Sequence, residues 1–247
     1  MPAVSQVPAG NVAMSDVSEW VGIDGFNSSD VCQAGIQETV QTAGGKTSVS
    51  VSAWDEWFPA GSNTIAASSF SVNAGDTVKI TVQTLGAGSS TALFIFDNVT
   101  TGKTFDASLT APKGTTLVGN SAEVVTETPE WTIGGQTSQP LLADFLNTPI
   151  TFKDIAATFK SGAAASLSSA QSIGMETNAA PGSNGSFVQE AFGSVNAGSD
   201  SVSVTENDYW GSSTSTSTTK PSAPSASHWS PPPPDLSLSW SRHHWWG

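Results

Sequence analysis

Residues 47–59 read TSVSVSAWDEWFP, and their alternation predicts a β-strand with two different faces. Successive side chains of an extended chain point to opposite sides of it. One side carries Val49, Val51, Ala53, Asp55 and Trp57, and the other carries Ser50, Ser52, Trp54, Glu56 and Phe58. The first set is mostly apolar and suits a core. The second is too polar to be buried whole and too aromatic for an ordinary solvated face, so we interpret it as the floor of a binding groove.

The charge composition excludes several classes of function. The 247 residues include 21 acidic and 8 basic side chains, a net charge of -13, which argues against nucleic acid or an anionic membrane as a partner. The only arginine is Arg242, and the three histidines, His228, His243 and His244, also lie near the C-terminus. With Cys32 the one cysteine, the rest of the chain cannot build a Ser/His/Asp or Cys/His nucleophile and has few zinc ligands. We therefore expect carboxylates, amides and hydroxyls to do any chemistry, without a metal or cofactor.

The first residues, MPAVSQVPAGNV, have neither the basic nor the apolar region of a signal peptide. No run of the sequence approaches the ~20 apolar residues of a membrane-spanning helix. These features predict a soluble chain that carries no export signal of its own.

Short β runs separated by Gly, Asn, Asp and Ser predict an all-β fold, an antiparallel sandwich of two packed sheets. We predict strands at residues 20–24, 31–37, 47–57, 64–71, 77–84, 91–97, 122–127, 149–153 and 202–206, and a helical turn at 164–171. The end of the chain changes to Ser, Thr and Pro, a composition that cannot offset its ordering entropy. We divide the chain into an N-terminal remnant at 1–19 (irregular or an edge strand), a β-sandwich at 20–210 and a disordered tail at 211–247.

Three other predicted strands also gather polar residues, aromatic residues and glycines on one side. Alternation groups Trp20, Gly22 and Asp24 in WVGIDG, Gln33, Gly35 and Gln37 in VCQAGIQ, and Glu123, Val125 and Glu127 in SAEVVTE. Strands of an ordinary sheet that expose one face to solvent show the same periodicity. Periodicity alone therefore favours the interpretation that these residues are ordinary solvent-facing residues. The accumulation of Trp, Gly and acids, rather than Lys and Thr, favours a site.

In this order, and followed by LLADF at 141–145, these motifs resemble the glutamic peptidases of the eqolisin type, over residues 20–205. The resemblance implies a concanavalin-like β-sandwich and a secreted, acid-acting endopeptidase that cleaves polypeptides, which we expect to be a monomer. It implies that Gln33 and Glu123 form the catalytic dyad. It further implies that four residues bind substrate in the groove: Trp20, Asp24, Trp54 and Glu56.

The chain departs from the family pattern in three respects. Family domains begin about two strands earlier, and a sandwich without those strands exposes an edge and part of its core. The residue after the catalytic glutamate is Val124, where the family has an aromatic residue. The tail after Trp210 matches nothing in the family.

Two other classes of function fit the same residue types. Glu56 and Glu123 could be the carboxylate pair of a glycoside hydrolase, with Trp20 and Trp54 as platforms for sugar rings. A lectin-like binding module, or a truncated and inactive relative of the peptidases, would need no catalytic residue. Cleavage of a denatured protein in acid distinguishes the peptidase from these alternatives.

Overall fold

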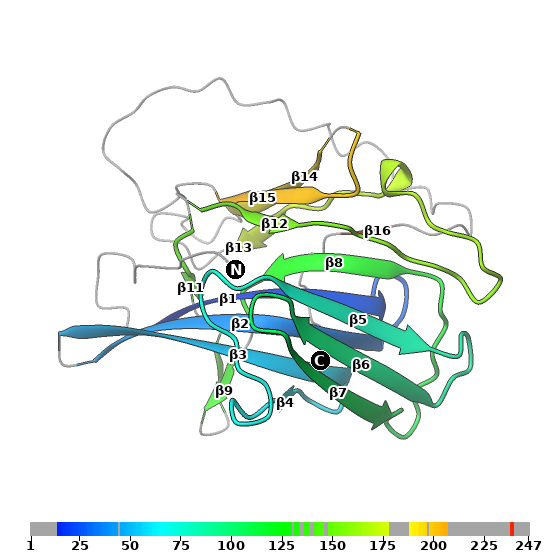
Figure 1. Cartoon of the computed structure of the whole chain (residues 1–247), viewed down its shortest axis with the longest axis horizontal. Coiled ribbons are helices and arrows are strands. Elements are labelled where there is room, and N and C mark those ends of the chain that lie inside the picture. Colours follow the sequence, from blue (N-terminus) through cyan, green and yellow to red (C-terminus); the bar gives the residue numbers. More distant parts are fainter. Residues whose placement is uncertain are drawn as a thin grey trace.

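The computed structural model describes residues 14–43, 45–129, 131–133, 136–138, 141–145, 148–177, 188–196, 198–206 and 238–239. Within these ranges the chain is almost entirely β-structure, and the one helical element is the 3₁₀ turn η1 (Leu167–Ser169). The predicted antiparallel β-sandwich is confirmed (Figure 1). Of the tail predicted at 211–247, only 238–239 is described, and these two residues form a short strand. For the rest of the tail, the prediction of disorder lies outside the described residues.

The largest sheet is built on four strands in the order β8 (Ala122–Glu127), β1 (Met14–Asp24), β2 (Val31–Ala43) and β3 (Lys46–Phe58), all antiparallel to their neighbours. We call it the main sheet. Three short strands extend it: β4 (Asn63–Thr64) beside β3, and β11 (Leu141–Leu142) and β16 (Leu238–Ser239) parallel to β1 and β8.

Two smaller sheets cover one face of the main sheet. The first contains β5 (Val78–Thr84), β6 (Thr91–Asn98) and β7 (Lys103–Thr110). The second has the order β12 (Ile150–Phe152), β15 (Val202–Glu206), β14 (Val188–Val195) and β13 (Met175–Thr177). A separate hairpin pairs β9 (Trp131–Ile133) with β10 (Gln136–Ser138).

The core is divided between these two sheets. Under β5–β7, Phe94 and Phe96 of β6 pack with Ile36 and Trp57 of the main sheet. Under β12–β15, a second cluster joins Val17, Val40 and Val124 of the main sheet with Val202 and Val204 of β15. All these main-sheet side chains point to the same face, since they alternate with the residues of the predicted groove. We call this covered side the inner face and the opposite side the groove face.

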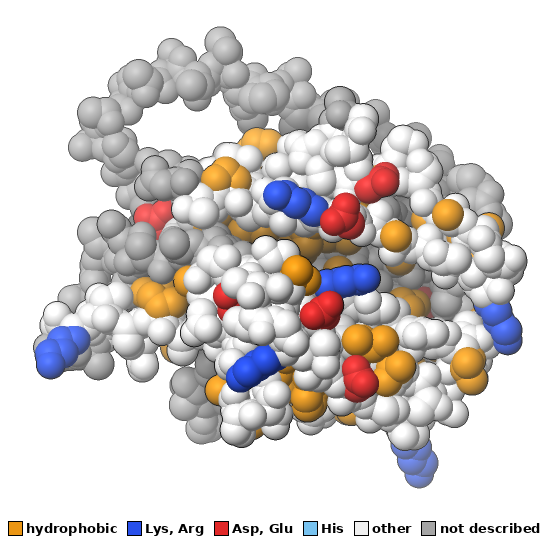
Figure 2. All heavy atoms as spheres, viewed as in Figure 1, with side chains coloured by type: hydrophobic (Ala, Val, Ile, Leu, Met, Phe, Trp, Pro, Cys, Tyr) orange, Lys and Arg blue, Asp and Glu red, His pale blue; other side chains and the backbone are white. Residues whose placement is uncertain are grey.

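The two smaller sheets do not join each other in the described part of the chain. In Figure 1, β12 lies above β8 in the view and β5 lies below it, and Figure 2 shows hydrophobic side chains inside the hollow between the upper and lower parts of the molecule. A cavity lined by both strands occupies this place.

The observed strands differ from the predicted ones at β1 and β4, and the eight-residue strands β7 and β14 were not predicted. β1 begins at Met14, so residues 14–19 belong to an inner strand where we predicted an irregular or edge segment at 1–19. The sequence pattern did not reveal this part of the strand, because Asp16, Ser18 and Glu19 are polar. In the structure, neighbouring strands and sheets bury these three residues. Of the strand predicted at 64–71, only Thr64 lies in a strand, β4. The apolar residues Ile65 and Phe70 pack into the core from the loop that follows.

Candidate active site

Four residues from four strands form one row across the groove face. Glu123 of β8 is paired with Gly22 of β1, Gly22 with Gln33 of β2, and Gln33 with Glu56 of β3. Residues directly opposite each other in an antiparallel sheet project their side chains to the same face. The sheet register therefore brings Gln33, Glu123 and Glu56 to one side of the molecule.

Gly22 lies between Glu123 and Gln33 in this row. These two residues are on strands separated by one strand, about 10 Å between backbones at the usual strand spacing, and a side chain at position 22 would project between them. A Cβ atom there would lie 2.9 Å from the ring of Trp20 and 3.2 Å from a methyl group of Val31. The absence of a side chain at position 22 thus lets Trp20 and Val31 pack closely beside the row.

The Gln33 amide is held in place by Glu56. Its Nε2 donates a hydrogen bond of 2.5 Å to Oε2 of Glu56, and Gln33 is only 6% exposed. Burial raises the pKa of Glu56, the hydrogen bond from Gln33 opposes this, and the nearby charge of Glu127 raises the pKa further. Because an amide nitrogen carries two hydrogens, Gln33 retains a second N–H for another acceptor.

The other catalytic residue predicted, Glu123, lies in a tight pocket beside a turn. It is 4% exposed, and its Oε2 is 3.2 Å from where a Cβ atom at Gly25 would lie. Gly25 has φ +100°, a conformation that favours glycine. The WVGIDG motif therefore ends in a turn that admits the carboxyl group of Glu123.

The two predicted groove tryptophans lie in the next row of the groove face. Val125, Trp20, Gly35 and Trp54 are paired in that order across β8, β1, β2 and β3. The indole N–H of Trp54 donates to the Ser18 hydroxyl at 3.0 Å. Both rings are largely buried in a small cluster with Val31 and Val125, so they form a well-packed apolar surface beside the Gln33–Glu123 row.

Asp24 does not join these residues on the open face. It has φ 69°, which turns the chain at the end of β1, and it is fully buried. Its Oδ2 accepts a hydrogen bond from the amide of Val118 at 2.7 Å, and its Oδ1 accepts those of Gly119 at 2.7 Å and Asn120 at 3.2 Å. Burial raises the pKa of Asp24 and the amide hydrogen bonds oppose that rise. Its carboxylate holds the loop that leads into β8.

Sequence reasoning missed two polar residues of this face, Asp16 and Ser18. Ser18 lies in a row with Glu127, Gln37 and Ser52, and Asp16 accepts a 3.4 Å hydrogen bond from Gln37. Both have the same parity as Trp20. The alternation would have found them had it been extended towards the N-terminus.

The described residues contain no group of three or more His, Cys, Asp and Glu side chains that could hold a metal ion. Among the same residues, no helix has the length and apolar character needed to cross a membrane. The row places a carboxyl group and an amide on one sheet face, and these two groups could carry out acid–base chemistry on a water molecule.

The model of the Peptidase A4 family matches residues 1–206. The chain belongs to this family. Its members include the eqolisin-type glutamic peptidases, so the predicted resemblance is confirmed, and the family and its structures identify a hydrolase of peptide bonds. No curated protein is similar enough in sequence to count as a match.

Solved structures of glutamic peptidases share the fold of this family member. Aspergilloglutamic peptidase from Aspergillus niger is 28% identical, with a TM-score of 0.61 over 78% of this chain and 99% of that chain. Scytalido-glutamic peptidase with a transition state analog inhibitor is 22% identical, with a TM-score of 0.65 over 81% and 87% of the two chains. SCP-B, an eqolisin in a complex with the tripeptide Ala-Ile-His, is 20% identical, with a TM-score of 0.60 over 81% and 86%.

Proposed function

We propose that this member of the Peptidase A4 family is an acid-acting endopeptidase in which Gln33 and Glu123 are the catalytic residues. The observation that carries the proposal is the row Glu123–Gly22–Gln33, in which the glycine separates a carboxyl group and an amide on one sheet face. The membership of the family and the fold of the glutamic peptidases support the same reaction class.

Each side chain has one task in the reaction. Glu123 takes a proton from a water molecule held between it and Gln33, and the water oxygen attacks the carbonyl carbon of the peptide bond. The free N–H of Gln33 donates a hydrogen bond to the oxyanion that forms. Glu123 then returns the proton to the amide nitrogen, the C–N bond breaks, and the amine leaves.

The choice of an amide for the oxyanion site suits acid conditions. A glutamine side chain does not titrate, so Gln33 remains an N–H donor at any pH at which the fold persists. Glu56 accepts the other N–H, and its oxygen accepts this bond whether the carboxyl group is ionised or neutral. The pair therefore keeps the donor oriented in acid.

We assign different roles to the four groove residues. Trp20, Trp54 and Glu56 line the groove beside the dyad, with Glu56 orienting Gln33. Asp24 acts through the loop at 118–120, which it binds, and positions β8 rather than contacting substrate. We expect the enzyme to act outside the cell as a monomer.

The test is hydrolysis of a denatured protein in acid by the purified chain and three variants. Glu123→Gln should abolish turnover, since an amide neither accepts the proton of water nor returns it. Gln33→Ala should lower kcat by about 10² to 10³, the usual loss for one oxyanion donor. Glu56→Gln should have a smaller effect, because its oxygen can still accept the hydrogen bond from Gln33.

The glycoside hydrolase alternative makes the opposite prediction for the same variants. It requires Glu56 as much as Glu123 and gives Gln33 no part in the reaction. An active Gln33→Ala enzyme with an inactive Glu56→Gln enzyme would overturn the proposed dyad, and a wild-type chain without any acid proteolysis would overturn the proposed function.

A further inference from the structure

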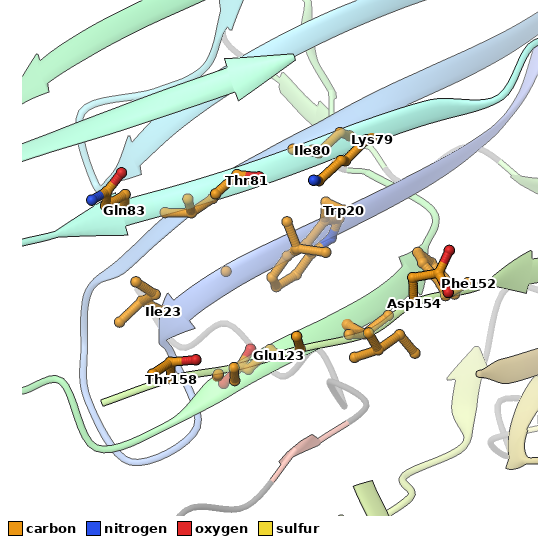
Figure 3. Close-up of a pocket in the computed structure, with 18 of the residues that line it drawn as sticks. Trp20, Ile23, Lys79, Ile80, Thr81, Gln83, Glu123, Phe152, Asp154 and Thr158 are labelled. Carbon is orange, nitrogen blue, oxygen red and sulfur yellow. The ribbon is translucent and has the colours of Figure 1, made fainter. Parts of the chain in front are cut away.

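The turn between β1 and β2, residues 25–30, lies against the carboxyl group of Glu123. A Cβ atom at Gly25 would lie 3.2 Å from Oε2 of Glu123 and 3.1 Å from Cβ of Val31. Figure 3 shows Glu123 on β8 beside the arrowhead that ends β1, where this turn begins. The backbone at Gly25 therefore forms one wall around the carboxyl group to which we assign the acid–base chemistry.

The pairing of β1 with β2 does not hold the backbone of this turn. The pairing ends at Asp24 and Val31, and no two backbone groups within residues 25–30 are hydrogen-bonded to each other. Asp24 and Gly25 both have positive φ, 69° and 100°, and a glycine has the widest range of backbone conformations of any residue. Side-chain hydrogen bonds therefore have to keep Gly25 in its place beside Glu123.

Ser28 supplies these hydrogen bonds. Its hydroxyl oxygen accepts a hydrogen bond from the N–H of Gly25 at 2.9 Å, and the same hydroxyl donates to the carbonyl oxygen of Asp30 at 2.9 Å. A hydroxyl group can donate and accept at the same time, so one side chain joins the two ends of the turn. Ser29, the next residue, is exposed and takes no part in this bridge.

Asp30 connects the bridge to the core of the main sheet. It is 5% exposed, and its Oδ2 accepts a hydrogen bond of 3.4 Å from the indole N–H of Trp57. Trp57 is buried and packs in the cluster under β5–β7. The contacts thus lead from a core residue, Trp57, through Asp30 and Ser28 to the glycine that adjoins Glu123.

We propose that Ser28 is a positioning residue of the peptidase, whose hydroxyl holds Gly25 against Glu123 and so fixes where this carboxyl group meets the attacking water. The inference rests on the proposed function, in which Glu123 is the base and then the acid. The hydroxyl bonds only to the backbone of its own turn, so it acts through Glu123 rather than on substrate. Displacing a reacting group by about 1 Å can lower the rate by about 10².

Three variants of the full chain test the proposal, in acid hydrolysis of a denatured protein. Ser28→Ala should lower kcat by about ten- to a hundredfold and change KM by less than about twofold, because it misplaces Glu123 and leaves the groove intact. Ser28→Thr retains the hydroxyl and should recover most of the wild-type kcat. Ser29→Ala removes a neighbouring hydroxyl outside the bridge and should have the wild-type kcat.

The pH dependence of kcat distinguishes positioning from a general loss of stability. Opening the turn admits water to the Glu123 carboxylate and favours its charged form, so the acid limb of the kcat profile should move to lower pH in Ser28→Ala. Asp24, Asp30 and Glu56, the other carboxyl groups of the row and the turn, are present in every variant, so this shift does not come from a lost charge. Hydrogen exchange should be faster at residues 25–30 of Ser28→Ala and unchanged in β6, which shows that the turn opens in a folded protein.

Three results would overturn this inference and leave the proposed function intact. They are a wild-type kcat in Ser28→Ala, an acid limb that does not move, and a Ser28→Thr enzyme as slow as Ser28→Ala. Equal losses in Ser28→Ala and Ser29→Ala, or lost protection of β6 in Ser28→Ala, would also overturn it, because the role of Ser28 would then be structural. A wild-type chain without acid proteolysis would overturn the proposed function and, with it, the role given to Ser28.

Discussion

At the scale of single residues, the groove face depends on the absence of a side chain at position 35. A Cβ atom on Gly35 would lie 2.6 Å from the carbonyl oxygen of Glu19, 2.6 Å from Cβ of Trp20 and 2.9 Å from the ring of Trp54. Two of these contacts are with atoms that cannot rotate away. We expect Gly35→Ala to lower the free energy of unfolding by about 1–3 kcal/mol, as overpacking of a core does, in urea titrations followed by tryptophan fluorescence.

Gly22→Ala is the matched variant. Its new methyl group would meet side-chain atoms of Trp20 and Val31, which can shift, so it should cost less stability than Gly35→Ala. It should nevertheless reduce peptidase activity, because the methyl group projects from the row between Gln33 and Glu123. A Gly35→Ala protein as stable as the wild type would contradict this account of the aromatic floor.

At the scale of elements, Asp24 connects the end of β1 to the beginning of β8. The three loop amides that it binds precede the strand that carries Glu123, and the Asp24 amide itself donates to Ser121 O at 3.1 Å. Removing a charged acceptor leaves these partly buried donors without their partner, at a cost of about 1–3 kcal/mol. We expect Asp24→Ala to speed amide hydrogen exchange at residues 118–120 and to lower kcat more than it raises KM.

Asp76→Ala is a control for a buried aspartate at a different turn. Asp76 accepts hydrogen bonds of 2.9 Å from the Asn73 amide and the Asn98 side chain. Its loss should loosen the β5–β7 sheet and leave exchange at 118–120 unchanged. Unaltered exchange at 118–120 in Asp24→Ala would show that the loop holds its position without the carboxylate.

At the scale of the whole molecule, the buried acids predict greater stability in acid than at neutral pH. Burial raises the pKa of Glu19, Asp24, Glu38, Asp55 and Glu56 in the folded state. Between the ordinary carboxyl pKa and these raised values the folded chain binds more protons than the unfolded chain, so stability falls as pH rises. For Glu38 this window extends to about pH 7. We expect Tm from calorimetry to be higher at about pH 4 than at pH 8.

Two variants test the origin of this pH dependence. Glu38→Gln removes one buried acid and should flatten the fall of Tm with pH. Asp106→Asn changes an exposed residue and should keep the wild-type profile. Asp76 has the opposite effect on the pH dependence, because the hydrogen bond from Asn98 lowers its pKa. Its contribution to the free energy of unfolding is therefore lost in strong acid. A Tm that rises from pH 4 to pH 8 would contradict the prediction.

The sequence alone determined the class of fold and the membership of each strand face. Alternation is a local property, so the printed residues suffice to group Gln33 with Gln37, or Glu123 with Glu127. β8 and β15 have the predicted bounds, and β2 and β3 contain the predicted segments. The order of the motifs also identified the family that the family model then matched.

Only the tertiary structure decided which residues face each other. The row Glu123–Gly22–Gln33–Glu56 depends on the register of four strands, which is set by contacts between segments far apart in the sequence. Asp24 follows the alternation of β1 in the sequence, but its positive φ and the loop amides take it out of the groove. The cavity between β5 and β12 likewise arises from how separate sheets pack on one face. No local pattern encodes that packing, because it depends on distances between elements.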